Sequence, residues 1–224
     1  MGGMSLDQGV PRWSWRLVTV GFGVLLAAVA VLAAALALGA ADPPRAGPLL
    51  WMDDFKSGTA RWQFLESGGA RLAARDGALV ADLAPGQSTT ALTARPNGDF
   101  TLEVAGAQTS GATGARYGLV FGWNDVDHYS VILINGNGYA EAYHLDGGQR
   151  QGWFTWQEWP NILVGTDSNR VRLDVRGRQI TVRINDEILL ETTAESGGKV
   201  GVMADDSLSP SLVVFSWVKA WGQP

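Results

Sequence analysis

Apolar and polar residues alternate strictly in the C-terminal part of the chain. In Arg170–Arg176 three apolar side chains alternate with four charged ones, and Gln179–Ile184 repeats the period of two. This period places apolar side chains on one face of a β-strand and polar ones on the other. Turn-forming residues follow each run, Gly177-Arg178 after the first and Asn185-Asp186 after the second, before Glu187–Glu191. The pattern predicts three antiparallel strands with one solvated face.

The remainder of the chain after residue 49 shows related patterns. Ser130–Ile134 is a nearly continuous apolar run, which predicts a strand buried on both faces. Asn135–Gly138 is a strong hairpin signal before the strand Tyr139–His144. No amphipathic helix is predicted here, and many short strands with glycine-rich turns predict an all-β, two-sheet antiparallel jelly-roll sandwich. Further strands are predicted at Ala78–Leu83, Asp99–Ala105, Arg116–Trp123, Lys199–Ala204 and Leu212–Trp221.

The N-terminal segment differs from everything that follows. Between residues 17 and 41 every residue except Thr19 is apolar or glycine. At ~1.5 Å per helical residue, this run is long enough to cross a hydrocarbon core of ~30 Å. It predicts a transmembrane anchor at 17–41 in contact with the lipid bilayer. Arg12 and Arg16 favour a cytoplasmic segment at 1–16. We therefore expect a single-pass protein of the cell membrane, with its C-terminal domain outside the cytoplasm.

A cleaved signal peptide is the alternative interpretation of this segment. Gly39-Ala40-Ala41 would suit a signal peptidase, although the apolar core of a signal peptide is only ~7–15 residues long. Residues 42–48 contain three prolines and one glycine, which predicts a stiff, extended spacer. No second linker and no internal repeat follows. Residues 49–224 are therefore predicted to form one domain with a sizeable core.

Composition excludes several classes of function. The chain has 224 residues, a formal net charge of −5 and no cysteine. It therefore has no disulfide framework, no thiolate metal site and no cysteine nucleophile. An acidic chain with three lysines is poorly suited to binding nucleic-acid phosphates, so no nucleic-acid partner is expected. The 29 glycines are interpreted mainly as turns and bulges.

Several segments of the predicted β domain follow one another in a characteristic order: Asp53-Asp54-Phe55 with Trp62, Asp76–Leu79, Asn169–Glu191, Gly197–Val202 and Val213–Val218. Their order resembles the laminin-G-like domains of the concanavalin A-like lectin and glucanase superfamily. The resemblance covers about residues 49–221 and implies two curved antiparallel sheets whose first and last strands are neighbours. It also implies a superfamily of sugar-binding modules, glycosidases and protein-interaction domains.

The sequence offers little support for catalysis. Retaining glucanases of this superfamily carry a Glu-x-Asp-x-x-Glu motif on one strand, and the chain contains no such motif. The nearest carboxylate pair, Asp125 and Asp127, lies among turn-forming residues, which favours a solvated turn over an acid–base pair. His128 beside them is interpreted as a surface or hydrogen-bonded histidine rather than a general base. No serine stands in a recognisable nucleophile context, so no catalytic residue is assigned.

An aromatic cluster is the strongest functional signal. Pro160 and the lack of period-two alternation predict a loop around it. Exposed tryptophans on a rigid scaffold can stack on sugar rings while nearby polar groups bond to hydroxyls. The alternative is that these rings fill the core, as is expected for Trp51, Trp62, Trp217 and Trp221. The candidate ligand-binding residues are Trp153, Trp156, Gln157, Trp159, Trp123 and Tyr143, with Tyr139 as a further platform residue.

No cofactor and no metal ligand is assigned. The resemblance makes a structural Ca²⁺ compatible with the fold, and two acidic pairs, Asp53/Asp54 and Asp205/Asp206, are the candidates, because Ca²⁺ takes six to eight oxygen ligands. Three functions remain open. The first is a membrane-anchored, extracytoplasmic, non-catalytic module that binds a glycan or cell-wall polysaccharide. The second is a protein-interaction or accessory subunit with a membrane-protein partner, and the third is a glycoside-processing enzyme.

Overall fold

The structure is a computed structural model that describes residues 12–37, 47–111, 114–205 and 208–223. The chain divides into two compact units, residues 1–44 and 45–224. The first contains helix α1 (Arg12–Ala37), whose described side chains, from 18 to 34, are all exposed. Over the described residues, no helix is both long enough and apolar enough to cross a membrane. Most of the predicted N-terminal segment, the end of the predicted anchor and most of the predicted spacer lie outside the described residues.

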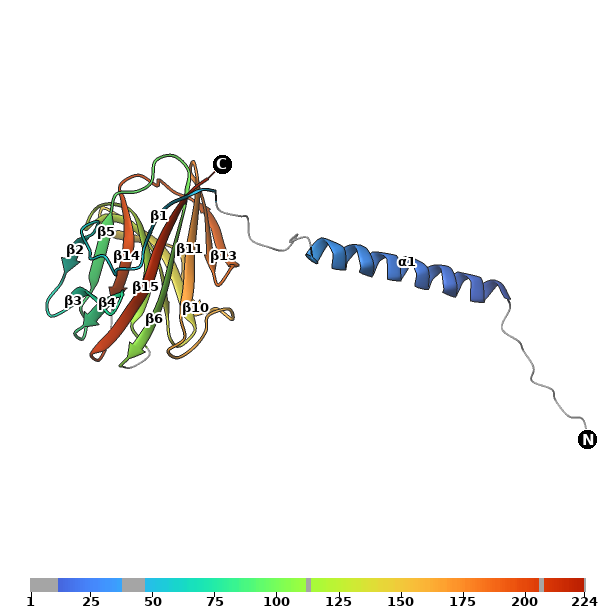
Figure 1. The fold of residues 1–224 in the computed structure, drawn as a ribbon, viewed down its shortest axis with the longest axis horizontal. Helices are drawn as coiled ribbons and strands as arrows, with labels where there is room; N and C mark the ends of the chain where they lie inside the picture. Colours follow the sequence, from blue (N-terminus) through green and yellow to red (C-terminus); the bar gives the residue numbers. More distant parts are fainter. Residues whose placement is uncertain (1–11, 38–46, 112–113, 206–207, 224) are drawn as a thin grey trace, which may run out of the picture. The chain divides into compact units, whose positions relative to one another are not determined.

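The second unit is a sandwich of two antiparallel sheets, as the alternating pattern predicts (Figure 1). We name them sheet A and sheet B. Sheet A has the strand order β13-β12-β11-β6-β15-β4-β3, and β1 pairs with the last residues of β15. Its strands are β1 (Leu49–Asp53), β3 (Arg71–Arg75), β4 (Ala78–Leu83), β6 (Phe100–Ser110), β11 (Asn169–Arg176), β12 (Gln179–Ile184), β13 (Glu187–Thr193) and β15 (Ser211–Gly222).

Sheet B has the order β10-β9-β8-β7-β14-β5-β2. The predicted hairpin at Asn135–Gly138 joins two of its central strands, β8 and β9. The residues Val131–Ile134 of β8 are completely buried, which confirms the prediction of a strand covered on both faces. The strands of sheet B are β2 (Gln63–Glu66), β5 (Thr89–Thr93), β7 (Arg116–Asp125), β8 (His128–Asn135), β9 (Tyr139–Asp146), β10 (Gln149–Glu158) and β14 (Lys199–Asp205).

The core lies between the two sheets. Alternate residues of β6 and β15 in sheet A, and of β7 and β14 in sheet B, point into it and are buried. The ring of Phe215 in sheet A meets the ring of Tyr117 in sheet B edge to face, with 6.4 Å between their centroids. Fully burying a side chain of this size stabilises the fold by roughly 1.5–3 kcal/mol. The two sheets are thus held together by period-two apolar faces.

The first and last strands are neighbours, as the resemblance implies. Trp51 of β1 lies opposite Ala220 of β15, and its ring packs edge to face on Trp62. The indole N–H of Trp62 donates to Asp53 at 2.7 Å. The partners of β15, which are β1, β4 and β6, all come much earlier in the chain, so β15 completes sheet A through long-range pairing.

Two predictions from the sequence are wrong. The aromatic segment around Trp156 is not a loop but the second half of β10, the edge strand of sheet B. The register of β10 shifts between Gly152 and Phe154 and again between Phe154 and Gln157, which removes the period-two pattern of a regular strand. Trp217 and Trp221 are half-buried on the outer face of sheet A, because the β15 residues that face the core are their neighbours.

Glycines at the centre of sheet B make close approach of strands possible. A Cβ on Gly201 of β14 would collide with the backbone carbonyl of Ala91 on β5. We therefore expect Gly201→Ala to lower the free energy of unfolding by about 1–3 kcal/mol, the range for overpacking. Gly152→Ala is the matched control, since a Cβ there meets nothing within 4 Å. Chemical denaturation of both variants tests this, and equal stability of the two would contradict it.

Candidate functional site

The outer face of sheet B carries its own buried cluster, separate from the sandwich core. It is built from residues of β5, β7, β8, β9 and β14 whose neighbours in sequence point into the core. The side chains that cover this cluster form the outward surface of sheet B, and aromatic rings with a few polar groups among them are typical of a binding surface. This surface, which we call the sheet B face, is the candidate site. The buried members are Leu92, Val120, Val131, Leu133, Tyr143 and Met203.

A charged network lies on the sheet B face. Arg116 of β7 donates two bonds to Asp205 of β14, at 2.9 and 3.1 Å, and one to Glu141 of β9 at 2.7 Å. Arg150 of β10 bonds to the other oxygen of Glu141. The side chain of Glu141 is only 1% exposed. A carboxylate buried so deeply is stable only when cations bond to it, and bidentate arginine pairing is the strongest form of such bonding.

Aromatic rings border this network on one side. Trp156 stacks on Tyr139, with 5.6 Å between the ring centroids, and the Arg116 guanidinium lies 6.0 Å from the Trp156 ring. The hydroxyl of Tyr139 donates to Glu158 at 3.2 Å, and this hydrogen bond to a carboxylate raises the Tyr139 pKa. Trp156 is 39% exposed, so part of its ring is open to solvent.

A second aromatic pair lies toward the other end of the same face. Trp123 stacks on Tyr129 with 4.6 Å between centroids. Both rings line a pocket of about 290 Å³, together with Leu65 and Met203. Between the two aromatic pairs, the Arg150 guanidinium lies 3.9 Å from the centroid of the Tyr143 ring, and burial raises the Tyr143 pKa. The face therefore presents rings at both ends and charges between them.

The dimensions of this surface suit an extended ligand. Arg116 begins β7 and Trp123 lies near its end, and at ~3.3 Å per strand residue they are on the order of 20 Å apart. Flat rings can stack on apolar faces of a ligand, while guanidinium and carboxylate groups bond to its polar substituents. The arrangement is therefore chemically suited to binding a polyhydroxylated chain.

The structure brings only part of the predicted binding set together. Trp123, Tyr143 and Trp156 share the sheet B face. Trp153 packs against the core instead, between Phe121 and His144, and Trp159 packs edge to face on Phe154. Gln157 is exposed on the edge strand opposite Ala140, whose side chain belongs to the core. Side chains three residues apart in a strand point to opposite faces, which separates Trp153 from Trp156. The bulges in β10 instead place Phe154 on the inner side together with Trp153.

Sequence reasoning missed the charged residues of the site. Arg116, Glu141, Arg150 and Asp205 are far apart in the sequence and belong to four different strands. One signal was present, since Glu141 alternates with Tyr139 and Tyr143 and the two positions between them are alanines. Alternation places this carboxylate on the same face as two tyrosines. Its cationic partners become visible only once the strands are paired.

The residues considered for catalysis have structural partners. Asp125 ends β7 and pairs with His128 across a two-residue turn, and it accepts a bond from the backbone N–H of Asp127 at 2.8 Å. The predicted solvated turn is therefore confirmed. Ser130 and His144 are hydrogen-bonded at 3.0 Å, but the serine is completely buried among core-facing residues and no substrate can reach it there.

The candidate calcium ligands do not fit a metal ion. Both oxygens of Asp53 accept protein hydrogen bonds, from Trp62 and from the backbone of Phe55. Both oxygens of Asp205 bond to the Arg116 guanidinium, which occupies the position that a cation would need. Asp206 lies outside the described residues. Over the described part of the chain, no group of three or more histidine or acidic side chains could hold a metal.

Solved structures share this fold. The carbohydrate-binding module CBM66 from Bacillus subtilis superposes with a TM-score of 0.57 at 15% identity, covering 71% of this chain and 95% of the module. The carbohydrate recognition domain of Emp46p, in a point-mutant form, gives 0.58 at 12%, covering 76% and 92%. The GH43 protein BlXynB from Bacillus licheniformis gives 0.60 at 13%, covering 76% of this chain but only 39% of that protein.

These likenesses confirm the predicted fold, a two-sheet antiparallel β-sandwich of the jelly-roll kind. No protein-family model matches the chain, and no curated protein matches it. At such low identity the likeness concerns the fold, and one fold of this kind hosts many functions. Function must therefore be inferred from the chemistry of the site.

The hairpin at the rim of the sheet B face predicts a pH response. A 2.8 Å hydrogen bond from His128 to Asp125 raises the pKa of the imidazole and lowers that of the carboxyl. The pair stabilises the hairpin between these two pKa values. Its contribution disappears as the pH rises through the folded pKa of His128 or falls through that of Asp125. We expect Asp125→Asn to lower the His128 pKa, measured by NMR titration of the imidazole protons.

Asp127→Asn is the matched control for this titration. The Asp127 carboxylate is not hydrogen-bonded to the imidazole and has only a weaker electrostatic effect on His128. The His128 pKa should therefore fall less in Asp127→Asn than in Asp125→Asn. Equal decreases in the two variants would mean that general charge, not the hydrogen bond, sets the His128 pKa.

Proposed function

We propose that this protein is a glycan-binding module that uses the sheet B face. One observation carries the proposal. Two stacked aromatic pairs, Tyr139 with Trp156 and Trp123 with Tyr129, lie on either side of an arginine–carboxylate network. Stacked rings bind the C–H faces of sugars, and charged groups with oriented hydrogen bonds select among hydroxyl patterns.

Two further facts support a glycan as the ligand. The solved structures that share the fold include a carbohydrate-binding module and a carbohydrate recognition domain, by their names. The charged groups on this face are also mutually compensated, since Arg116 and Arg150 bond to Glu141, and Arg116 bonds to Asp205 as well. A site of balanced charge favours a neutral, polyhydroxylated ligand over a strongly charged one. Glycans or cell-wall polysaccharides meet this requirement.

Binding should depend on the exposed rings of the sheet B face. We expect Trp156→Ala and Trp123→Ala each to weaken binding about tenfold or more, ~1.4 kcal/mol, because each removes a stacking surface. The measurement is titration of the full chain, in a detergent without a sugar headgroup, against ligands found on a glycan and polysaccharide array. Trp221→Ala is the matched control, since Trp221 is a half-buried ring on the other sheet.

Four results would contradict this proposal. Absence of binding across the array, or equal losses in Trp156→Ala and Trp221→Ala, would remove the sheet B face as a glycan site. Hydrolysis of a bound glycan that is lost in Glu141→Gln would make the protein a glycosidase. A protein partner that co-purifies in stoichiometric amount and dissociates in Trp156→Ala would instead favour an accessory subunit of a membrane complex.

We also propose that the module is held at a membrane, outside the cytoplasm, by residues 17–41. The proposal rests on the composition of this run, which has no charged residue, and on the preceding Arg12 and Arg16. The apolar side chains of α1 are exposed from Val18 to Ala34, and an apolar surface of this kind needs lipid or protein around it.

Fractionation tests the anchor. The full-length protein should stay in the membrane pellet at alkaline pH and in high salt, because these treatments release only proteins that are attached by surface charges. It should enter solution only with detergent. Its intact mass should be that of the whole chain, and protease added outside intact cells should degrade the β-domain. Release by alkali, or a mature chain that begins at Asp42, would contradict the anchor and favour a cleaved signal peptide.

A further inference from the structure

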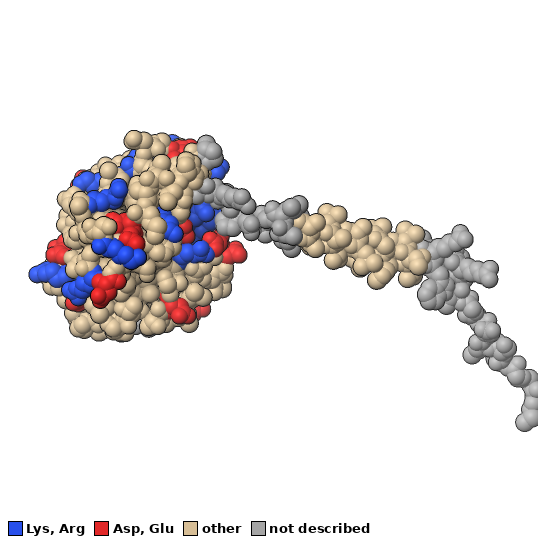
Figure 2. Space-filling model, in the orientation of Figure 1, with Lys and Arg blue, Asp and Glu red and all other residues tan. Residues whose placement is uncertain are grey.

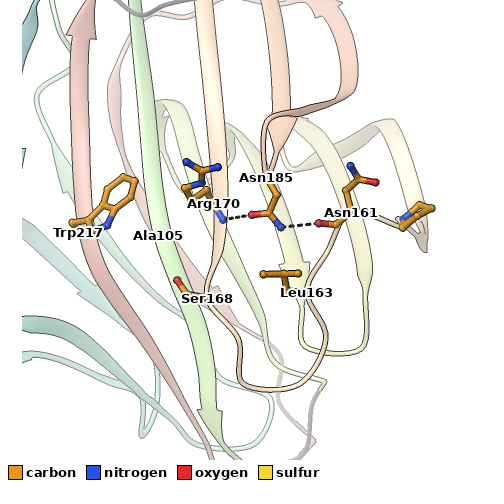
Figure 3. A pocket seen from close by; sticks show the side chains of 8 residues that line it. Ala105, Asn161, Leu163, Ser168, Arg170, Asn185 and Trp217 are labelled. Carbon is orange, nitrogen blue, oxygen red and sulfur yellow. Dashed lines mark hydrogen bonds between the residues drawn. The ribbon is translucent and has the colours of Figure 1, made fainter. Parts of the chain in front are cut away.

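A pocket of about 530 Å³ lies on the outer face of sheet A, away from the sheet B face (Figure 3). Its floor is Ala105 of β6, which is only 4% exposed. Trp217 of β15 lies directly across from Ala105 on one side, and Arg170 of β11 lies across from it on the other. The two large side chains are therefore two strand spacings apart, ~9.6 Å, with a methyl group between them. This leaves a slot in the sheet surface.

Polar groups and an apolar side chain complete the pocket. Asn161, Leu163 and Ser168 come from the loop between β10 and β11 (Figure 3). Leu163 is 49% exposed, so it offers an apolar wall. Lys219 lies 4.0 Å from the centroid of the Trp217 ring but does not line the pocket. The slot thus combines a flat ring with a hydroxyl, an amide and a guanidinium.

The loop that forms one wall is held in place by two asparagines, of which Asn169 is buried and Asn185 is half-buried. Asn169 is 1% exposed, and it accepts from the backbone N–H of Leu163 at 2.8 Å and donates to its carbonyl at 2.9 Å. Asn185 donates to the carbonyl of Asn161 and to the side chain of Asn169, both at 2.7 Å. The pocket is therefore formed before any ligand arrives, which lowers the entropic cost of binding.

Charge determines which kind of ligand suits this pocket. Arg170 bonds to Asp186, and its Nε lies 3.9 Å from the carboxylate of Glu103. Its positive charge is thus already compensated, and an anionic ligand would meet two carboxylates. The face that carries β15 and β6 shows basic and acidic side chains interspersed rather than a patch of one sign (Figure 2). A neutral ring with hydroxyl groups fits better than a uronate or an acidic peptide.

We propose that the sheet A pocket is a second binding site, for a neutral sugar ring, independent of the sheet B face. The ring stacks on Trp217 above the Ala105 methyl group, and its hydroxyls bond to Ser168, Asn161 and the free donors of Arg170. Because the two sheets face opposite ways, a module with both sites holds two glycan chains at once. Binding at the sheet A pocket does not require binding at the sheet B face, so either proposal can be contradicted while the other holds.

Indole NMR signals separate the two sites. The full chain is labelled with ¹⁵N-tryptophan in a detergent without a sugar headgroup and titrated with methyl glycosides of glucose, mannose, galactose, xylose and fructose. The Trp217 signal is assigned through Trp217→Phe. We expect at least one neutral glycoside to shift the Trp217 signal saturably. Ala105→Leu should weaken this response at least tenfold, because its side chain fills the floor of the slot.

Ala107→Leu is the matched control for bulk. Ala107 is the next outward residue of β6 and does not line the pocket, so its variant should keep the Trp217 response. A Trp217 signal that no neutral glycoside moves, or that responds equally in Ala105→Leu and Ala107→Leu, would overturn the second site. Tighter binding of methyl glucuronide than of any neutral glycoside would overturn the assigned ligand class. If the glycosides shift the Trp123 and Trp156 signals but not the Trp217 signal, the second site is contradicted and the sheet B proposal is supported.

Discussion

The buried carboxylate of Glu141 is the constraint on which the sheet B face depends. An unpaired charge at such depth would cost on the order of several kcal/mol. Arg116 and Arg150 satisfy it from two other strands, and Arg116 also holds Asp205 on a third. These bonds tie β7, β9, β10 and β14 together on one face. The guanidinium groups of Arg116 and Arg150 also lie beside the rings of Trp156 and Tyr143, so the network that satisfies one carboxylate contacts part of the aromatic surface.

The sandwich has two outward faces, and different kinds of side chain cover the strands on each of them. The sheet B face covers itself with a second apolar cluster, so its strands are buried on both sides. Sheet A has a charged outer face instead, on which the neighbouring residues Arg172, Arg183, Asp174 and Thr101 pair with one another. Where this charged layer is interrupted by Ala105, a slot opens between two strands. The sheet A pocket thus lies where the charged layer on that sheet is interrupted, whereas the sheet B site lies over an apolar cluster.

The aromatic segment of β10 shows where sequence patterns stop being informative. Three tryptophans within seven residues pointed to a binding loop, but the structure places Trp153 and Trp156 on an edge strand with two register shifts, and Trp159 directly after it. In a strand, side chains three residues apart point to opposite faces, so these two rings separate. Trp156 turns outward to Tyr139, while Trp153 packs inward on Phe121. Nothing in the residue order marks the position of either bulge.

Local patterns were sufficient for the all-β architecture, for the hairpins at Asn135–Gly138 and Asn185-Asp186, and for the strand buried on both faces. These features depend on residues close together in the chain, where alternation and turn preference act directly. The sites needed the tertiary structure. The Arg116–Glu141 network and the slot over Ala105 each unite residues from several strands. Their assembly depends on strand order and register, and these arise from long-range packing that no short segment encodes.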